Sequence, residues 1–317
     1  MSAGGRQSHP ETIPASLVTY ENLQNLMQLL TEKESLRRNL KSGNLGQRLK
    51  SVEEANALLD RVAKITHEVL RREDNLPKEP QLVLTDRLKK LPAMTFRIYL
   101  FYIPLCALLL YLVLSAPKGG VALLVVLAAL VLLLAVPYLV YRRTRLNIEH
   151  SGKYRRKAEG RAVIEIDQLQ SVQFQSCLAH EYAHHLYYEL GGQIEEAWPR
   201  EGWARLVQWH VMDNLCRTEE NPAYLYHVLL QIIGELKFAC IVLSSLLRVR
   251  LPSKVRRIRT IYSNNPFYRL IAGTPGFSMN SLTRHAVGTA SCLLIERRYG
   301  LHQALRECLR KPFTENS

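Results

Sequence analysis

The stretch AVIEIDQLQSVQFQSCLAHEYAHHLYYELGG, residues 162–192, joins a short alternating segment to a long helical one. Residues 162–167 alternate apolar and acidic side chains, which is typical of a strand with an exposed face or at the edge of a sheet. Residues 171–189 are predicted to form a helix that stops at Gly191 and Gly192. Strand and helix together indicate an α+β fold, and the many other helical segments make it mostly helical.

The helical part contains the pattern HExxH. His180 and His184 are four residues apart, so on a helix they lie one turn above each other and can hold one metal ion. Glu181 projects about 100° around the helix, beside the ion, where a carboxylate can take a proton from an activated water. Such a pattern is expected by chance only about 0.02 times in this composition, which disfavours an ordinary polar helix face. His185 points to another face, where packing is the expected role.

A catalytic zinc site needs a third protein ligand and one open position. Glu189 lies on the same helix and would point away from the ion. Glu201 is the expected ligand, because a turn at Gly191-Gly192 and a helix start at Trp198-Pro199 let a second helix fold back. Other candidates that stay open are Glu195, Glu196 and His210.

The segments AHEYAHHL and REGWARL together resemble the gluzincin metallopeptidases, whose peptidase-MA-like group has HExxH followed on a second helix by EGxA. The resemblance covers mainly residues 160–210, with a weaker similarity at 265–300. It implies a zincin-like fold and one Zn²⁺ per chain, held by His180, His184 and Glu201, with Glu181 as general base. It also implies that a peptide substrate pairs along the strand Ile164, Glu165, Ile166 and Asp167.

One position departs from that family. Many gluzincins carry a second carboxylate four residues after the ligand Glu, and here that residue is Arg205. The carboxylate that orients a ligand histidine is then missing or comes from Asp213 or Glu196. Candidates for stabilising a developing oxyanion are Arg284, His285, Tyr262 and Tyr268. Packing is the expected role of the three tryptophans, Trp198, Trp203 and Trp209.

Two apolar segments precede this region. Residues 98–115 and 121–141 carry no charge, and each is long enough to cross about 30 Å of hydrocarbon as a helix. Only residues 116–120 join them, so they are predicted to form a transmembrane hairpin with both ends on one side. A buried hairpin in a soluble core is the weaker alternative.

Basic residues flank the hairpin, and its tip offers only Lys118. They are Arg87, Lys89, Lys90 and Arg97 before it, and Arg142, Arg143, Arg145, Lys153, Arg155, Arg156 and Lys157 after it. The positive-inside bias places both flanks, both termini and the catalytic domain in the cytoplasm. With a formal charge of +14, anionic lipid headgroups are the expected partner, because no nucleic-acid motif supports the other interpretation.

The cysteines, the first thirty residues and a third apolar stretch further narrow the class of protein. The six cysteines lie singly, without a CxxC pair, which predicts thiols in a reducing compartment. The first thirty residues show no pattern of a signal peptide. Residues 225–247 form a third apolar stretch, but Glu235 and Lys237 at its centre favour a buried helix over a membrane span.

The sequence therefore predicts a helical and loose segment 1–50, a first part of a cytoplasmic domain at 51–95, a transmembrane hairpin at 96–141 and a zincin-like catalytic domain at 142–317. The predicted function is that of a membrane-bound zinc endopeptidase acting on a peptide or protein. Its first rival is a catalytically degenerate membrane scaffold with the same fold, and its second is a zinc hydrolase of other substrates. The sequence does not indicate an oligomeric state.

Overall fold

The computed structural model of the chain describes residues 13–40, 43–71, 79–92, 152–156, 161–192, 197–252 and 281–309, with scattered positions between 100 and 145. Its elements are η1 (Ala15–Leu17), α1 (Tyr20–Asn39), α2 (Val52–Leu70), β1 (Gln81–Thr85), β2 (Lys153–Arg156), β3 (Ala162–Asp167), α5 (Ser171–Glu189), α6 (Ala197–Thr218), α7 (Ala223–Leu246), α10 (Ser281–Tyr299) and α11 (Leu301–Leu309). Helices predominate beside one small sheet. The prediction of a mostly helical α+β class is confirmed.

The sheet has the order β1-β3-β2. β1 runs parallel to β3, with Leu82 opposite Ile164, and β2 runs antiparallel to β3, with Tyr154 opposite Ile164. β3 is thus the central strand of the described sheet, so of the two predicted alternatives, an exposed face or an edge, the edge is wrong. Its acidic residues have other partners: Glu165 pairs with Arg155 at 3.3 Å, and the buried Asp167 accepts a hydrogen bond from the Leu88 amide.

Strand β2 was not predicted, because its sequence KYRR reads as part of the basic flank of the hairpin. In the structure its side chains pair within the sheet region. Arg155 contacts Glu165 on β3, and Arg156 lies 3.8 Å from Glu189 at the end of α5. These two arginines therefore have protein partners, whereas the sequence assigned them to lipid headgroups.

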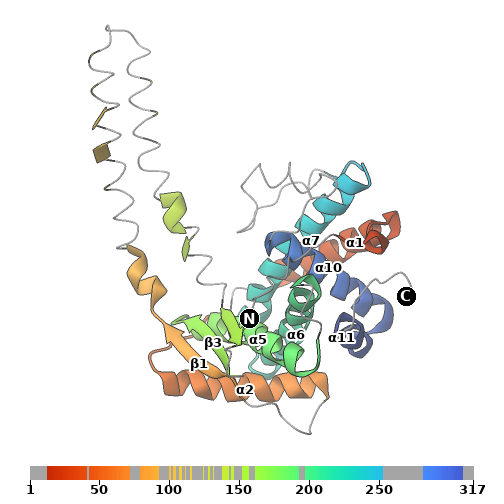
Figure 1. Cartoon of the computed structure of the whole chain (residues 1–317), viewed down its shortest axis with the longest axis horizontal. Helices are drawn as coiled ribbons and strands as arrows, with labels where there is room; N and C mark the ends of the chain where they lie inside the picture. Colours follow the sequence, from red (N-terminus) through yellow and green to blue (C-terminus); the bar gives the residue numbers. More distant parts are fainter. Residues whose placement is uncertain are drawn as a thin grey trace, which may run out of the picture.

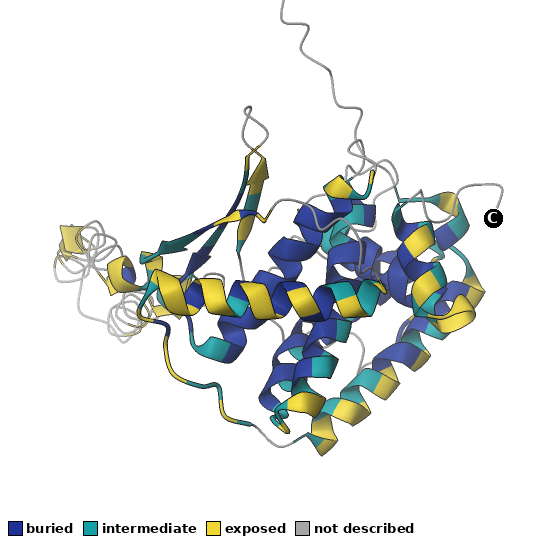
Figure 2. Cartoon of the chain, turned by 90° about the horizontal axis from the view of Figure 1, so that it is seen from below, coloured by how far each residue is buried: buried dark blue, intermediate teal, exposed yellow. Residues whose placement is uncertain are grey.

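Helix α5 connects the sheet to the helical part of the molecule. It follows β3 closely, and β1, β3 and α5 lie over α2 in Figure 1. α2 buries one stripe, including Leu59 and Val62, and exposes the opposite side (Figure 2). A cap fixes its start, since the Ser51 hydroxyl accepts a hydrogen bond from the Glu54 amide at 3.2 Å.

Helix α7 is the one described helix that is long and apolar enough to cross a membrane. The protein buries 78% of its most apolar window, and both charges at its centre are paired. Glu235 is fully buried against Arg205 of α6, and Lys237 reaches Glu34 of α1 at 2.5 Å. The burial predicted from these charges is confirmed.

The predicted hairpin at 96–141 lies mostly outside the described residues. Positions that are described there carry exposed apolar side chains. Leu108 is 54% exposed, and Tyr111 and Leu124 are each 67% exposed.

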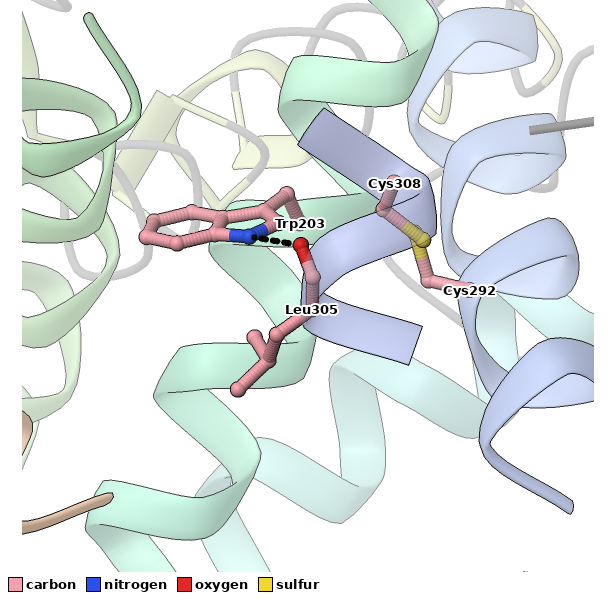
Figure 3. The surroundings of a disulfide bond; sticks show 4 residues. All are labelled: Trp203, Cys292, Leu305 and Cys308. Carbon is pink, nitrogen blue, oxygen red and sulfur yellow. Dashed lines mark hydrogen bonds between the residues drawn. A yellow bond between two sulfur atoms is a disulfide. The ribbon is translucent and has the colours of Figure 1, made fainter. Parts of the chain in front are cut away.

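A disulfide joins Cys292 of α10 to Cys308 of α11 (Figure 3). Close to it, the Trp203 indole N–H donates to the Leu305 carbonyl at 3.1 Å, which ties α11 to α6. The prediction of thiols is wrong for this pair, while Cys177, Cys216 and Cys240 are free. Disulfides persist in oxidising compartments, so the bond weighs against the expected reducing one.

The tryptophans have the packing role expected of them. Trp198, Trp203 and Trp209 are all buried on α6. α6 in turn packs closely on α10, because a Cβ at Gly202 would lie 2.1 Å from the Gly288 carbonyl oxygen. Two facing glycines thus bring α10 against the start of α6, next to Glu201.

Candidate metal centre

Two ring nitrogens on α5 face the start of α6. His180 and His184 lie one helical turn apart, with ring centroids 4.7 Å apart in an edge-to-face arrangement. Both side chains are buried, and within the described part of the chain their Nδ1 atoms have no hydrogen-bond partner. Their Nε2 atoms are the ones directed at Glu201.

Glu201 is the fifth residue of α6, just after its first turn, and this second helix returns to α5 as predicted. Its Oε2 lies 3.5 Å from Nε2 of His180 and 3.2 Å from Nε2 of His184. Ligand atoms of all three residues lie within 4.8 Å of one another, close enough to hold a metal ion. A tetrahedral zinc site with bonds of about 2.0–2.1 Å has ligand atoms roughly 3.3 Å apart, so the two measured separations suit that ion.

The return of α6 depends on the turn after α5. Gly191 has φ of +79°, a left-handed conformation that glycine adopts without strain. A Cβ at Gly192 would lie 2.3 Å from the Tyr187 ring, so the second glycine is required by space. The predicted role of this pair in ending α5 is confirmed.

Burial sets the protonation of the first ligand. Desolvation holds the pKa of His180 well below its usual value, against the opposing effect of Glu201. His180 is therefore neutral at neutral pH, which is the form in which imidazole binds a metal.

The carboxylate ligand is held in its charged form. Burial alone would raise the pKa of Glu201, but the neighbouring imidazoles of His184 and His285 and the hydrogen bonds from His180 and His184 lower it well below its usual value. Glu201 thus remains a carboxylate, as a metal ligand must be.

Glu181 lies beside this group rather than within it. Glu181 is 7% exposed, and its carboxylate accepts a hydrogen bond from the Tyr154 amide of β2 at 2.7 Å. Burial raises the pKa of Glu181, an effect that nearby His184 and the Tyr154 amide partly oppose. A raised pKa brings a carboxylate closer to the range in which it can both accept and return a proton.

These residues line one cavity of about 480 Å³. Its lining comes from β2, α5, α6 and α10: Gly152, Lys153, Tyr154, Cys177, His180, Glu181, His184, Tyr188, Arg200, Glu201, Arg205, Gln208 and His285. The cavity therefore contains the three possible metal ligands and the possible base together.

Arg205 is neutralised within the protein. Its guanidinium donates to both oxygens of Glu235, at 3.0 and 2.6 Å, and to Gln231 at 2.6 Å. The Thr289 hydroxyl also donates to Glu235, at 2.6 Å. Arg205 and Glu235 form a buried ion pair between α6 and α7 at the wall of the cavity, which explains how the charge of Arg205 is accommodated inside the protein.

The other predicted site residues divide into three groups. His285 of α10 belongs to the site, because its Nδ1 lies 3.4 Å from Oε2 of Glu201. Arg284 does not line the cavity. Tyr262, Tyr268, Glu195 and Glu196 lie outside the described residues.

Three alternatives for ligands or orienting groups are engaged elsewhere. Glu189 contacts Arg156, His210 contacts Glu296 at 2.5 Å, and Asp213 pairs with Arg217. The structure therefore favours Glu201 over Glu189 and His210 as third ligand, and does not bring Asp213 to a ligand histidine. His185 contacts the Tyr154 hydroxyl at 3.4 Å.

The predicted substrate strand needs correction. Ile164 and Glu165 of β3 have strand partners on both sides, Leu82 and Val83 in β1, and Tyr154 and Lys153 in β2. Their main chain is therefore unavailable to a peptide. The strand that borders the cavity is β2, whose Tyr154 amide points away from β3 towards Glu181.

Several cavity residues were missed in the sequence. Tyr188 continues the stripe of His180 and His184 at a spacing of four, a signal that could have found it. Gly152, Tyr154 and Arg200 carried no comparable pattern, because their place depends on how β2 and α6 fold against α5.

Gly152 gives a prediction of its own. A Cβ there would lie 2.5 Å from Cγ of Glu181, so Gly152→Ala must displace Glu181 or β2. We expect the free energy of unfolding of Gly152→Ala to fall by about 1–3 kcal/mol, the usual cost of inserting a methyl group into a packed site, while bound metal stays unchanged. Denaturant unfolding and metal content would be measured beside the wild-type protein. Wild-type stability in Gly152→Ala would contradict the close contact.

Comparison of the chain with protein-family models, with curated proteins and with solved structures found no match. The arguments for function therefore come from the geometry of this site.

Proposed function

We propose that this chain is a membrane-bound zinc-dependent endopeptidase with Glu181 as its general base. The observation that carries the proposal is the meeting of His180, His184 and Glu201 at ligand distance, with the buried Glu181 lining the same cavity. Two imidazoles and one carboxylate are a donor set of catalytic zinc sites, which leave one position open.

Zinc bound by these three residues would supply a polarised water as nucleophile and a Lewis acid for the carbonyl. Glu181 accepts the proton of the attacking water and returns it to the leaving amine, a role that its raised pKa suits. The Tyr154 amide orients the carboxylate during this transfer. His285, next to Glu201, is a candidate to stabilise the developing oxyanion.

The substrate is proposed to lie along the outer edge of β2. This strand borders the cavity at Gly152, Lys153 and Tyr154, and its outer edge has no strand partner in the described sheet. An extended peptide can add to such an edge through main-chain hydrogen bonds, which suits cleavage within a chain.

Membrane attachment is proposed to come from residues 98–115 and 121–141. Their uncharged length and the exposed apolar side chains described there support a transmembrane hairpin. The basic flanks favour cytoplasmic termini and a cytoplasmic catalytic domain, with anionic headgroups as the lipid partner. The Cys292–Cys308 disulfide favours a catalytic domain on the opposite side of the membrane. A reporter fused at Lys118 would decide: the charge distribution predicts it outside, and a cytoplasmic reporter would reverse the orientation.

The main rival is a scaffold of the same fold without catalysis. Purified protein in detergent would be tested on casein and a peptide library before and after chelation. Cleavage that chelation removes and zinc restores supports the proposal, and bound zinc without any cleavage would favour the scaffold.

A further inference from the structure

The two carboxylate oxygens of Glu201 have different surroundings. Oε2 faces three ring nitrogens, from His180 at 3.5 Å, His184 at 3.2 Å and His285 at 3.4 Å. Oε1 lies 3.5 Å from Nη2 of Arg200. A single oxygen is thus presented to the possible metal position, and the other is turned to a guanidinium.

Arg200 is itself fixed by α5. Its Nη1 donates to the Tyr188 hydroxyl, and its guanidinium lies over the Tyr188 ring, 5.7 Å from the centroid. Tyr188 is stacked in turn on Tyr154 of β2, with ring centroids 5.7 Å apart. The arginine is therefore held between two contacts, one to each of the helices that carry metal ligands.

The position of Arg200 suits a role in orienting a ligand. Its side chain lines the cavity and is 26% exposed, so it is not an ordinary solvated surface group. A carboxylate on a short, rotatable side chain can turn either oxygen, or both, towards a metal ion. An ion pair at Oε1 favours the rotamer in which Oε2 alone faces the histidines.

We infer that Arg200, held by Tyr188, is a positioning residue that makes Glu201 a ligand through one oxygen. The inference rests on the metal centre of the proposed function, but not on peptide hydrolysis. Many gluzincins carry, at the position of Arg205, a carboxylate that orients a ligand histidine. In this chain the orienting contact is made to Glu201 instead, by the arginine that precedes it in the sequence.

The test compares metal affinity, because that readout does not depend on catalysis. Zn²⁺ affinity of the full-length protein in detergent would be measured by competition with a chromophoric chelator. Arg200→Met is expected to weaken Zn²⁺ binding by about 10–100-fold, the usual effect of losing a contact to a ligand. Arg200→Lys, which keeps a charge near Oε1, should lie between this variant and the wild type.

Co²⁺ gives a second readout. The visible spectrum of the Co²⁺ protein depends on the coordination number. If Glu201 is free to bind through both oxygens in Arg200→Met, its absorption should weaken and shift relative to the wild type. Arg217→Met is the matched control, because Arg217 also pairs with a carboxylate on α6 but lies outside the cavity.

The outcomes separate this inference from the proposed function. Wild-type affinity and spectrum in Arg200→Met, or an equal loss in Arg217→Met, would overturn the inference and leave the metallopeptidase proposal intact. A wild-type protein that binds no zinc would overturn both. If Arg200→Met does not fold, Tyr188→Phe decides: weaker zinc binding supports the inference, and unchanged binding overturns it.

Discussion

Glu181→Gln is expected to lower kcat for peptide hydrolysis by about 10²–10⁴-fold, the usual contribution of a general base, with zinc content unchanged. Glutamine keeps the shape of the side chain and can still accept the Tyr154 amide hydrogen bond, but it cannot take a proton. The three possible metal ligands are untouched, so loss of activity would be separated from loss of metal.

The chain offers a matched control for this variant. His67-Glu68 on α2 begins like the motif, but Arg71 stands where the second histidine would be. Glu68→Gln should leave both hydrolysis and zinc content at the wild-type level. Hydrolysis of a quenched fluorescent peptide and zinc analysis by mass spectrometry measure the two effects. Activity in Glu181→Gln close to that of Glu68→Gln would remove Glu181 from the mechanism.

Glu201→Ala is expected to abolish stoichiometric zinc binding, and hydrolysis with it. Removing a group that only contacts a metal ligand typically weakens metal binding by about 10–100-fold. The loss of zinc affinity in Glu201→Ala should be larger, because this variant removes a ligand itself and leaves only two histidines. Equilibrium dialysis against buffered zinc would give the dissociation constant.

The controls for Glu201 are the other acidic residues around the turn. Glu189→Ala removes the carboxylate at the end of α5 that contacts Arg156, and Glu195→Ala and Glu196→Ala remove the two that precede α6. All three variants should retain zinc. Zinc loss in one of them, with retention in Glu201→Ala, would assign the third ligand to that residue instead.

Local spacing made part of the site predictable. His180 and His184 face the same way because four residues make about one helical turn, and the glycines after them specify where α5 ends. Glu201 followed from the same logic, since the next helix had to return. These features depend on short stretches of chain, which the sequence describes directly.

Contacts between distant segments were not predictable. Glu235 could be recognised as too costly for hydrocarbon, but its partner Arg205, thirty residues away, could not. The same holds for Cys292 and Cys308, which are sixteen residues apart on two helices. Neither pair follows a sequence pattern, because the first depends on how α6 packs against α7 and the second on how α10 packs against α11.

The sheet shows how charge can mislead. The alternating acidic residues of β3 predicted an exposed face or a sheet edge, yet Glu165 pairs with Arg155 and Asp167 is buried among its hydrogen-bond donors. The basic residues that cover one side belong to β2, and they had been assigned to the flank of the hairpin. One missed strand thus changed both the place of β3 and the expected path of the substrate.

The central claim is that His180, His184 and Glu201 hold one zinc ion. A crystal structure of the zinc-loaded protein, with anomalous data at the zinc edge, tests it most directly. The account predicts one peak at about 2.0–2.2 Å from Nε2 of both histidines and from Oε2 of Glu201, on the side of the cavity that Glu181 lines. A fully loaded protein with no peak between these atoms, or with zinc bound by other residues, would contradict it.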